Sequence, residues 1–197
     1  MTERDPSPAS MSSGAAAVLV HDASANPAVA GVTLRALTVN RDPRGTLTEL
    51  LRIDWPDLFN EGMPFAQVYA SQTGPGVARD EDRWHVHRHQ TDRFYCLAGR
   101  IVVAIADPRP HSSTRGAMML VELRATADAP APLVVSIPPC TLHGFVVTSD
   151  GPATLLNFPN RLYDPTDEGR LPFTDAGITL PDGTPFTYDA VRTLYAD

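Results

Sequence analysis

Prolines and glycines divide this chain into short segments, and this pattern limits the fold more than any other feature. Nineteen prolines occur in 197 residues, and proline interrupts helices because it lacks a backbone N–H and has a fixed φ. The segments between these breaks are rich in β-branched and apolar residues and are predicted strands. They span 32–39, 47–53, 65–71, 84–86, 94–106, 118–124, 133–137, 145–148 and 154–157. Such a series predicts an all-β sandwich or barrel, with only short helical segments at 55–59 and, near the C-terminus, at 189–194.

Length and composition indicate one domain of moderate acidity. Residues 1–31 are rich in Ser, Ala and Pro and are expected to form a flexible N-terminal arm, apart from a possible edge strand at 18–20, while 32–197 form a single domain. The net charge of -7, without a basic run, argues against nucleic acid as a partner. No apolar stretch has the length that a membrane span needs. Cys96 and Cys140 lie in apolar runs and are expected to be buried free thiols, as in a cytoplasmic protein.

Alternating histidines precede one of the predicted strands. Side chains two residues apart share one face of a strand, so His85, His87 and His89 would point the same way. Imidazoles gathered on one face indicate either a metal site or a polar catalytic pocket. His89 falls at a turn-like position and is expected at the surface. The acidic run 80–82 is expected to be a solvated loop.

Two segments resemble the motifs of cupin barrels. His85-x-His87, Asp92 and Gly99 match the first motif, and Pro138-x-Cys140-x-x-His143 resembles the second. This resemblance implies that His85, His87, Asp92 and His143 are candidate ligands of a divalent first-row metal.

A longer series of segments extends this resemblance over residues 42–189. It comprises 42–49, Gln67-x-Tyr69-x-Ser71, 76–79, Trp84-His85, 107–109, 113–116, Ile137-Pro138, His143-Gly144-Phe145 and 163–169. In order and spacing these segments resemble the dTDP-4-dehydrorhamnose 3,5-epimerase family, the RmlC-like cupins. The resemblance implies a cupin-type β-barrel or jelly roll that acts without a cofactor. It also implies a homodimer, formed by exchange of N-terminal strands near 18–20 and 32–39.

The family chemistry assigns roles to particular residues. The resemblance implies an isomerase or epimerase acting on a nucleotide-linked, dTDP-type 4-keto-6-deoxy sugar in a biosynthetic pathway. His85 would be the base that removes a proton next to the ketone, Asp189 the carboxylate that orients it, and His143 the group that stabilises the enolate. Five residues fall at positions that hold the nucleotide, the diphosphate or the barrel partner: Arg44, Glu49, Gln67, Arg79 and Glu168.

One departure from the family keeps alternatives open. The catalytic tyrosine of the family aligns near Leu156-Asn157, where neither side chain can replace it, and Tyr163 is the nearest phenol in sequence. One alternative is a metal-dependent cupin, an oxygenase, cyclase or lyase, acting on a small carbonyl substrate. The other is a non-catalytic barrel that binds a ligand.

Overall fold

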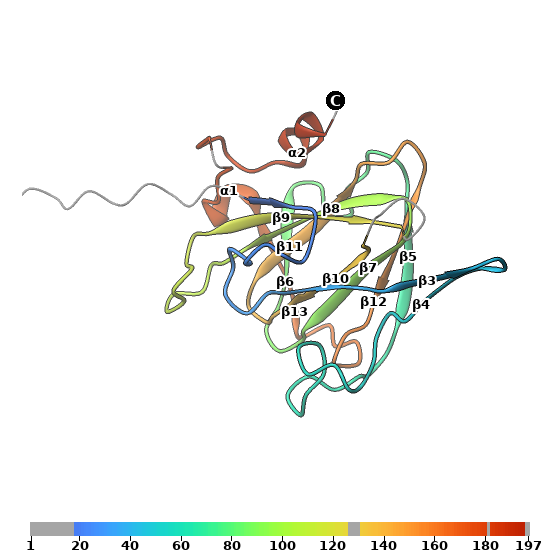
Figure 1. Ribbon diagram of the computed structural model, residues 1–197. Coiled ribbons are helices and arrows are strands. Elements are labelled where there is room, and N and C mark those ends of the chain that lie inside the picture. Colours follow the sequence, from blue (N-terminus) through green and yellow to red (C-terminus); the bar gives the residue numbers. More distant parts are fainter. Residues whose placement is uncertain (1–17, 126–130, 181, 196–197) are drawn as a thin grey trace, which may run out of the picture.

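Two facing β-sheets form the body of the molecule (Figure 1). The computed structural model describes residues 18–125, 131–180 and 182–195. The six-stranded sheet has the order β1 (Val18–Val20), β9 (Met118–Arg124), β8 (Arg100–Ala106), β11 (Leu142–Val147), β6 (Arg83–His87) and β13 (Glu168–Pro172). The five-stranded sheet has the order β2 (Thr33–Ala36), β10 (Leu133–Ile137), β7 (Asp92–Ala98), β12 (Ala153–Asn157) and β5 (Tyr69–Thr73). This architecture confirms the predicted all-β, cupin-type fold.

The main core lies between the two sheets. It is built from alternate residues of facing strands, among them Phe94 and Val135 of the five-stranded sheet and Val103, Val121 and Phe145 of the six-stranded sheet. Successive side chains of a strand point to opposite faces, so one residue in two of each strand enters this layer. The apolar runs of the sequence therefore supply both halves of one core.

A glycine turn divides the longest predicted strand. The run 94–106 forms two strands, β7 and β8, which belong to different sheets and meet at Gly99. Gly99 has a φ of 75°, and a Cβ atom there would lie 2.9 Å from backbone atoms of Pro152 and Ala153. Only glycine combines this conformation with such close packing.

Residues 18–31 belong to the folded barrel: the edge strand expected at 18–20 is confirmed as β1, whereas 21–31 were expected in a flexible arm. β1 pairs in parallel with β9, and Val20 and Val29 are buried in the main core. Apolar side chains that occur singly among Ser, Ala and Pro residues give little periodic signal, which explains the difference. The expected arm at 1–17 lies outside the described residues.

A covering layer packs on the outer face of the six-stranded sheet. It contains α1 (Phe173–Ala176) and α2 (Tyr188–Leu194), drawn in red at the top of Figure 1. Phe173, Phe186 and Tyr188 surround Trp84 of β6, whose ring stacks on Phe186 at 4.3 Å between centroids. This contact fixes the strand that carries the paired histidines.

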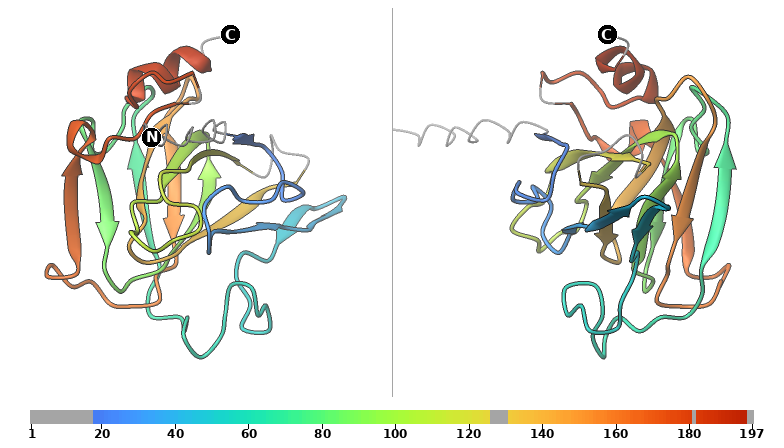
Figure 2. Two further views of the ribbon diagram at one scale, coloured as in Figure 1. Left: turned by 90° about the vertical axis from the view of Figure 1, so that its left-hand side faces the viewer. Right: turned by 45° about the vertical axis from the view of Figure 1, so that its right-hand side comes forward.

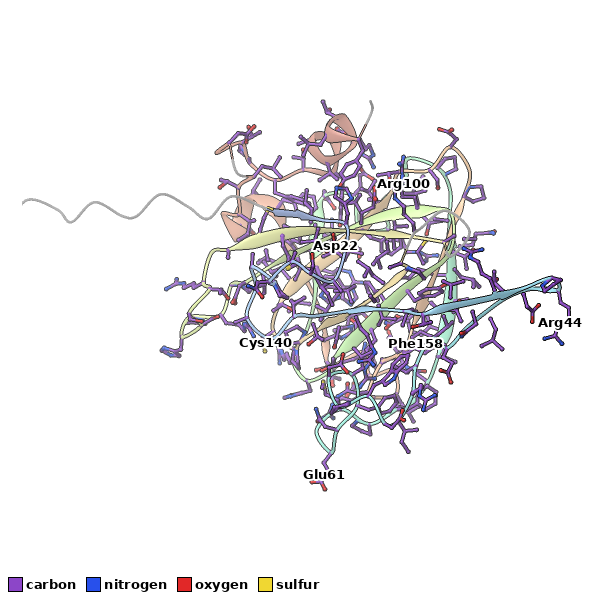
Figure 3. All side chains as sticks on the ribbon, viewed as in Figure 1. Asp22, Arg44, Glu61, Arg100, Cys140 and Phe158 are labelled. Atoms are coloured by element: carbon purple, nitrogen blue, oxygen red, sulfur yellow. The ribbon has the colours of Figure 1, made fainter. Side chains whose placement is uncertain are left out.

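A two-stranded hairpin extends away from the barrel. β3 (Val39–Asp42) and β4 (Gly45–Thr48) form this arm, and Arg44 lies at its far end (Figure 3). The predicted strand 47–53 is wrong beyond Thr48, because 49–53 lies outside the strands. None of the helices in the described part of the chain has the length and hydropathy that crossing a membrane requires.

Candidate active site

A cavity of about 190 Å³ opens between the two sheets. Its walls include His85 and His143 from the six-stranded sheet and Tyr69, Asp92 and Phe94 from the five-stranded sheet. The two facing layers therefore present different chemical groups to one space.

The alternation of β6 determines which side chains enter this cavity. Trp84 and Val86 point outward into the covering layer, whereas His85 and His87 line the cavity. The imidazoles of His85 and His87 approach to 2.9 Å between their Nε2 atoms. The strand ends at His87, so the exposed His89 does not share this face. The predicted surface position of His89 is confirmed.

A tight turn places the third imidazole beside the first two. Cys140 has a φ of 60°, in the left-handed region that favours glycine, and its N–H donates to the His87 carbonyl oxygen at 2.7 Å. β11 then begins, and His143 lies directly opposite His85 in the register of the two strands. Ligating atoms of His85, His87 and His143 all lie within 4.8 Å of one another. Both cysteines are free, as predicted, but the expectation that Cys140 is buried is wrong.

Asp92 and His143 form a buried pair across the cavity. Oδ2 of Asp92 lies 3.1 Å from Nε2 of His143, and Oδ1 accepts hydrogen bonds from the amides of Gln90 and Asn157. Burial alone would raise the pKa of Asp92, but the hydrogen bond and charge of His143 hold it below its usual range. Nδ1 of His143 lies 3.2 Å from the Thr141 carbonyl oxygen. Both nitrogens of the His143 ring therefore face oxygen atoms that accept hydrogen bonds.

The surroundings of His85 differ from those of His143, because they disfavour a positive charge on the ring. Burial, together with the nearby His143 and His87, lowers the pKa of His85, which keeps this imidazole neutral at neutral pH. Nδ1 of His85 faces two carboxylates, Asp80 at 3.8 Å and Glu168 at 3.7 Å. These negative charges favour a proton on Nδ1, which leaves Nε2, 2.9 Å from His87 Nε2, as the nitrogen that can accept a proton. The site thus combines an imidazole whose pKa is lowered with one whose two nitrogens both face acceptors.

Two charged groups hold the surroundings of the histidines in place. Arg170 forms ion pairs with both Asp80 and Glu168, and so fixes the two carboxylates behind His85. Asp167 accepts hydrogen bonds from the backbone N–H groups of residues 88, 89 and 90. The loop after β6 is thereby anchored to the segment that leads into β13.

Some predicted site residues lie away from the cavity. Asp189 is exposed on α2 and pairs with Arg192, so the carboxylates beside His85 are Asp80 and Glu168 instead. Arg44 is exposed on the arm beside Asp42, and Glu49 pairs with Arg52.

Of two further predicted residues, one lines the cavity and the other does not. Arg79 lines the cavity, where it donates to Thr73 Oγ1 and to the Gln72 carbonyl oxygen. Gln67 donates to the Arg161 carbonyl oxygen instead of entering the cavity.

Three further residues shape the site without having been predicted to do so. Asp80 was expected in a solvated loop, but it lines the cavity beside His85. Tyr69 and Asn157 are joined by a hydrogen bond of 2.8 Å, and Asn157 is almost fully buried. The sequence held a signal for each of these two: Tyr69 lies in a family-like segment, and Asn157 lies where the family tyrosine aligns.

Comparison with known proteins gives consistent matches over most of the chain. Residues 26–187 match the family described as dTDP-4-dehydrorhamnose 3,5-epimerase. The probable low-salt glycan biosynthesis epimerase Agl13 of Haloferax volcanii is 39% identical over 150 residues, which are 75% of this chain and 90% of that protein. The spore coat polysaccharide biosynthesis protein SpsL of Bacillus subtilis is 30% identical over 158 residues, 79% of this chain and 97% of that protein. A dTDP sugar isomerase from Desulfovibrio desulfuricans G20 superposes with a TM-score of 0.68 at 27% identity, covering 82% of this chain and 93% of that one.

Proposed function

This chain belongs to the dTDP-4-dehydrorhamnose 3,5-epimerase family, and on that premise we propose that it epimerises or isomerises a dTDP-type 4-keto-6-deoxy sugar. The observation that carries the proposal is the contrast between the two cavity imidazoles. His85 is held neutral, whereas both nitrogens of His143 face acceptors. A neutral imidazole that can take a proton, beside a second imidazole that can stabilise an oxyanion, is what removal of a proton next to a ketone requires.

In the proposed reaction His85 Nε2 takes the proton from the carbon next to the ketone. The electrons of the C–H bond move to the carbonyl oxygen, and His143 stabilises the resulting enolate. Asp80 and Glu168 stabilise the imidazolium that forms on His85, because they face its Nδ1 atom. Arg79, at the cavity wall, is suited to the diphosphate because its guanidinium group donates two parallel hydrogen bonds.

Hydrogen exchange tests this proposal directly. The protein is incubated with dTDP-4-keto-6-deoxyglucose in deuterated water, and deuterium at the carbons next to the ketone is measured by mass spectrometry and NMR. We expect uptake with the wild-type protein and a loss of at least about 100-fold in the His85→Asn variant. His89→Asn, which changes an exposed histidine outside the cavity, is the matched control and keeps the wild-type rate. No uptake together with no binding of dTDP would contradict the sugar assignment, whereas binding without uptake would favour a non-catalytic barrel.

A metal-dependent reaction is the second candidate, and one observation favours it. The clustered imidazoles of His85, His87 and His143, with Asp92 3.6 Å from His87 Nε2, form a donor set that suits a divalent first-row metal. Such a metal would act as a Lewis acid on a carbonyl oxygen. Metal analysis of protein purified without chelators distinguishes the candidates. We expect no stoichiometric metal, and an unchanged rate of deuterium exchange after chelator treatment. A stoichiometric metal whose removal stops turnover would make the metal-dependent reaction the preferred candidate.

We further propose that the chain acts as a homodimer. The arm of β3 and β4 holds Arg44 and Glu49 away from the cavity of their own chain. β2 is an edge strand of the five-stranded sheet, and an edge strand can pair with a second chain. A second copy would bring the arm to a neighbouring cavity. Light scattering in solution tests this, and a mass equal to one chain would refute it.

A further inference from the structure

Tyr69 faces the histidines from the opposite wall of the cavity. It lies on β5, the edge strand of the five-stranded sheet, whereas His85 lies on β6 of the six-stranded sheet. In the antiparallel register, Tyr69 is directly opposite Asn157 of β12. Its side chain is partly exposed, but its phenol oxygen reaches the buried Asn157. A phenol and an imidazole therefore border the same small space from two sides.

The hydrogen bonds of Asn157 determine how the phenol is oriented. Oδ1 of Asn157 accepts from the Arg93 N–H at 3.1 Å, so the Nδ2 end of the amide faces Tyr69 and Asp92. An amide nitrogen only donates, so the Tyr69 oxygen is the acceptor in its 2.8 Å bond. The phenol proton has no acceptor among the residues that the structure describes. It is available to a molecule bound in the cavity.

The surroundings of Tyr69 also suit transfer of that proton. Burial raises the pKa of Tyr69 above its ordinary value, so the phenol keeps its proton at neutral pH. When the proton leaves, the N–H of Asn157 stabilises the phenolate oxygen through the existing hydrogen bond. The amide thus supports the charged form, which occurs only during turnover.

We propose that Tyr69 is the catalytic acid that returns a proton to the substrate carbon from the face opposite His85. This inference rests on the proposed function and adds the group that decides the stereochemical result. His85 takes the proton from the carbon, and the enolate forms. The Tyr69 O–H bond then breaks, its proton forms the new C–H bond on the other face, and the enolate electrons supply that bond. Solvent water reprotonates the phenolate and removes the proton from His85. The carbon is inverted, with no change in oxidation state.

The Tyr69→Phe variant separates the two halves of this reaction. Deuterium uptake and the yield of inverted product are measured together with dTDP-4-keto-6-deoxyglucose in deuterated water. We expect uptake within about threefold of the wild type, because His85 still removes the proton and returns deuterium to the same face. Inverted product falls by at least about 100-fold, the usual effect of losing a general acid. Tyr163→Phe, at an exposed phenol away from the cavity, changes neither quantity.

The ratio of inversion to uptake distinguishes a catalytic from a structural role. A structural defect lowers uptake and inversion together, and such a result would overturn the role of Tyr69. Unchanged inversion in Tyr69→Phe would overturn it as well. A wild-type protein that neither exchanges nor inverts the substrate refutes the proposed function itself, and is thereby distinguished from failure of this inference alone.

Discussion

Asp107 is a buried carboxylate that organises a turn far from the cavity. It is fully buried and forms a two-pronged ion pair with Arg109, and it also accepts from Ser112 and Thr114. Arg109 and Thr114 in turn bind the backbone of Ala30. The carboxylate therefore connects the turn between β8 and β9 to the segment that precedes β2.

Replacing Asp107 by Asn should destabilise the protein in a pH-dependent way. Burial alone would raise the pKa of Asp107, but hydrogen bonds from Arg109, Ser112 and Thr114 hold it below its usual value of 3.8. The unfolded state therefore binds the proton more readily, and the stabilisation is complete above about pH 5 and is lost as the pH falls through 3.8 and below. We expect Asp107→Asn to lower the free energy of unfolding by about 2 kcal/mol at pH 7, and by less at pH 3. Urea denaturation at both pH values measures this, with the exposed Asp150→Asn as control. An equal loss at both pH values would contradict the role of the charge.

Residues that carry a chemical signature could be predicted from the sequence, and those defined by strand register could not. His85, His143 and Arg79 were placed in the site by motif, and all three line the cavity. Tyr69 and Asn157 are 88 residues apart, and their contact depends on how β5 pairs with β12. The resemblance implied that Asp189 orients His85, but α2 carries Asp189 to the exposed surface.

At the scale of elements, turn residues predicted most strand limits. The all-β class is confirmed by the two sheets, and the family by the match over residues 26–187. The strand β13 was missed, since Glu168–Pro172 lacks an apolar run and pairs with β6 at the edge of its sheet. The pairing of β13 with β6 depends on tertiary contacts, which the local strand propensity of the sequence does not reveal.

The contact between β11 and α2 gives a prediction about packing. A Cβ atom at Gly144 would overlap the phenol oxygen of Tyr188, which is buried and has no hydrogen-bond partner in the described structure. We expect Gly144→Ala to destabilise the protein by about 1–3 kcal/mol through overpacking. Tyr188→Phe removes the overlapping oxygen, so the double variant should recover most of that loss.

A double-mutant cycle tests this contact: the free energy of unfolding of the wild type, both single variants and the double variant is measured by thermal and urea denaturation. Additive losses in the double variant would contradict a direct contact.

At the scale of the whole molecule, the arm makes a test of shared active sites possible. In the proposed dimer, Arg44 acts at the cavity of the neighbouring chain. Arg44→Ala and His85→Asn are each expected to lose most activity. When they are coexpressed, mixed dimers contain one intact site, with His85 from one chain and Arg44 from the other.

About a quarter of the wild-type activity should then return, since half of randomly formed dimers are mixed and each has one intact site of two. The exchange assay on the coexpressed protein measures it, with separately expressed variants mixed after purification as control. If Arg44 served its own chain, no activity would return.

The covering layer, whose helix α2 is drawn in red at the top of both views in Figure 2, has a consequence for the timing of folding. Its aromatic residues, Phe173, Phe186 and Tyr188, follow every strand in the chain and yet hold Trp84 in place on β6. During synthesis on a ribosome, the strand that bears His85 therefore emerges well before the residues that support its back. The strands of the nascent barrel can pair first, and we expect the histidines to reach their final positions when residues 173–188 have left the ribosome. The geometry of the cavity is thus expected to be completed late in the synthesis of the barrel.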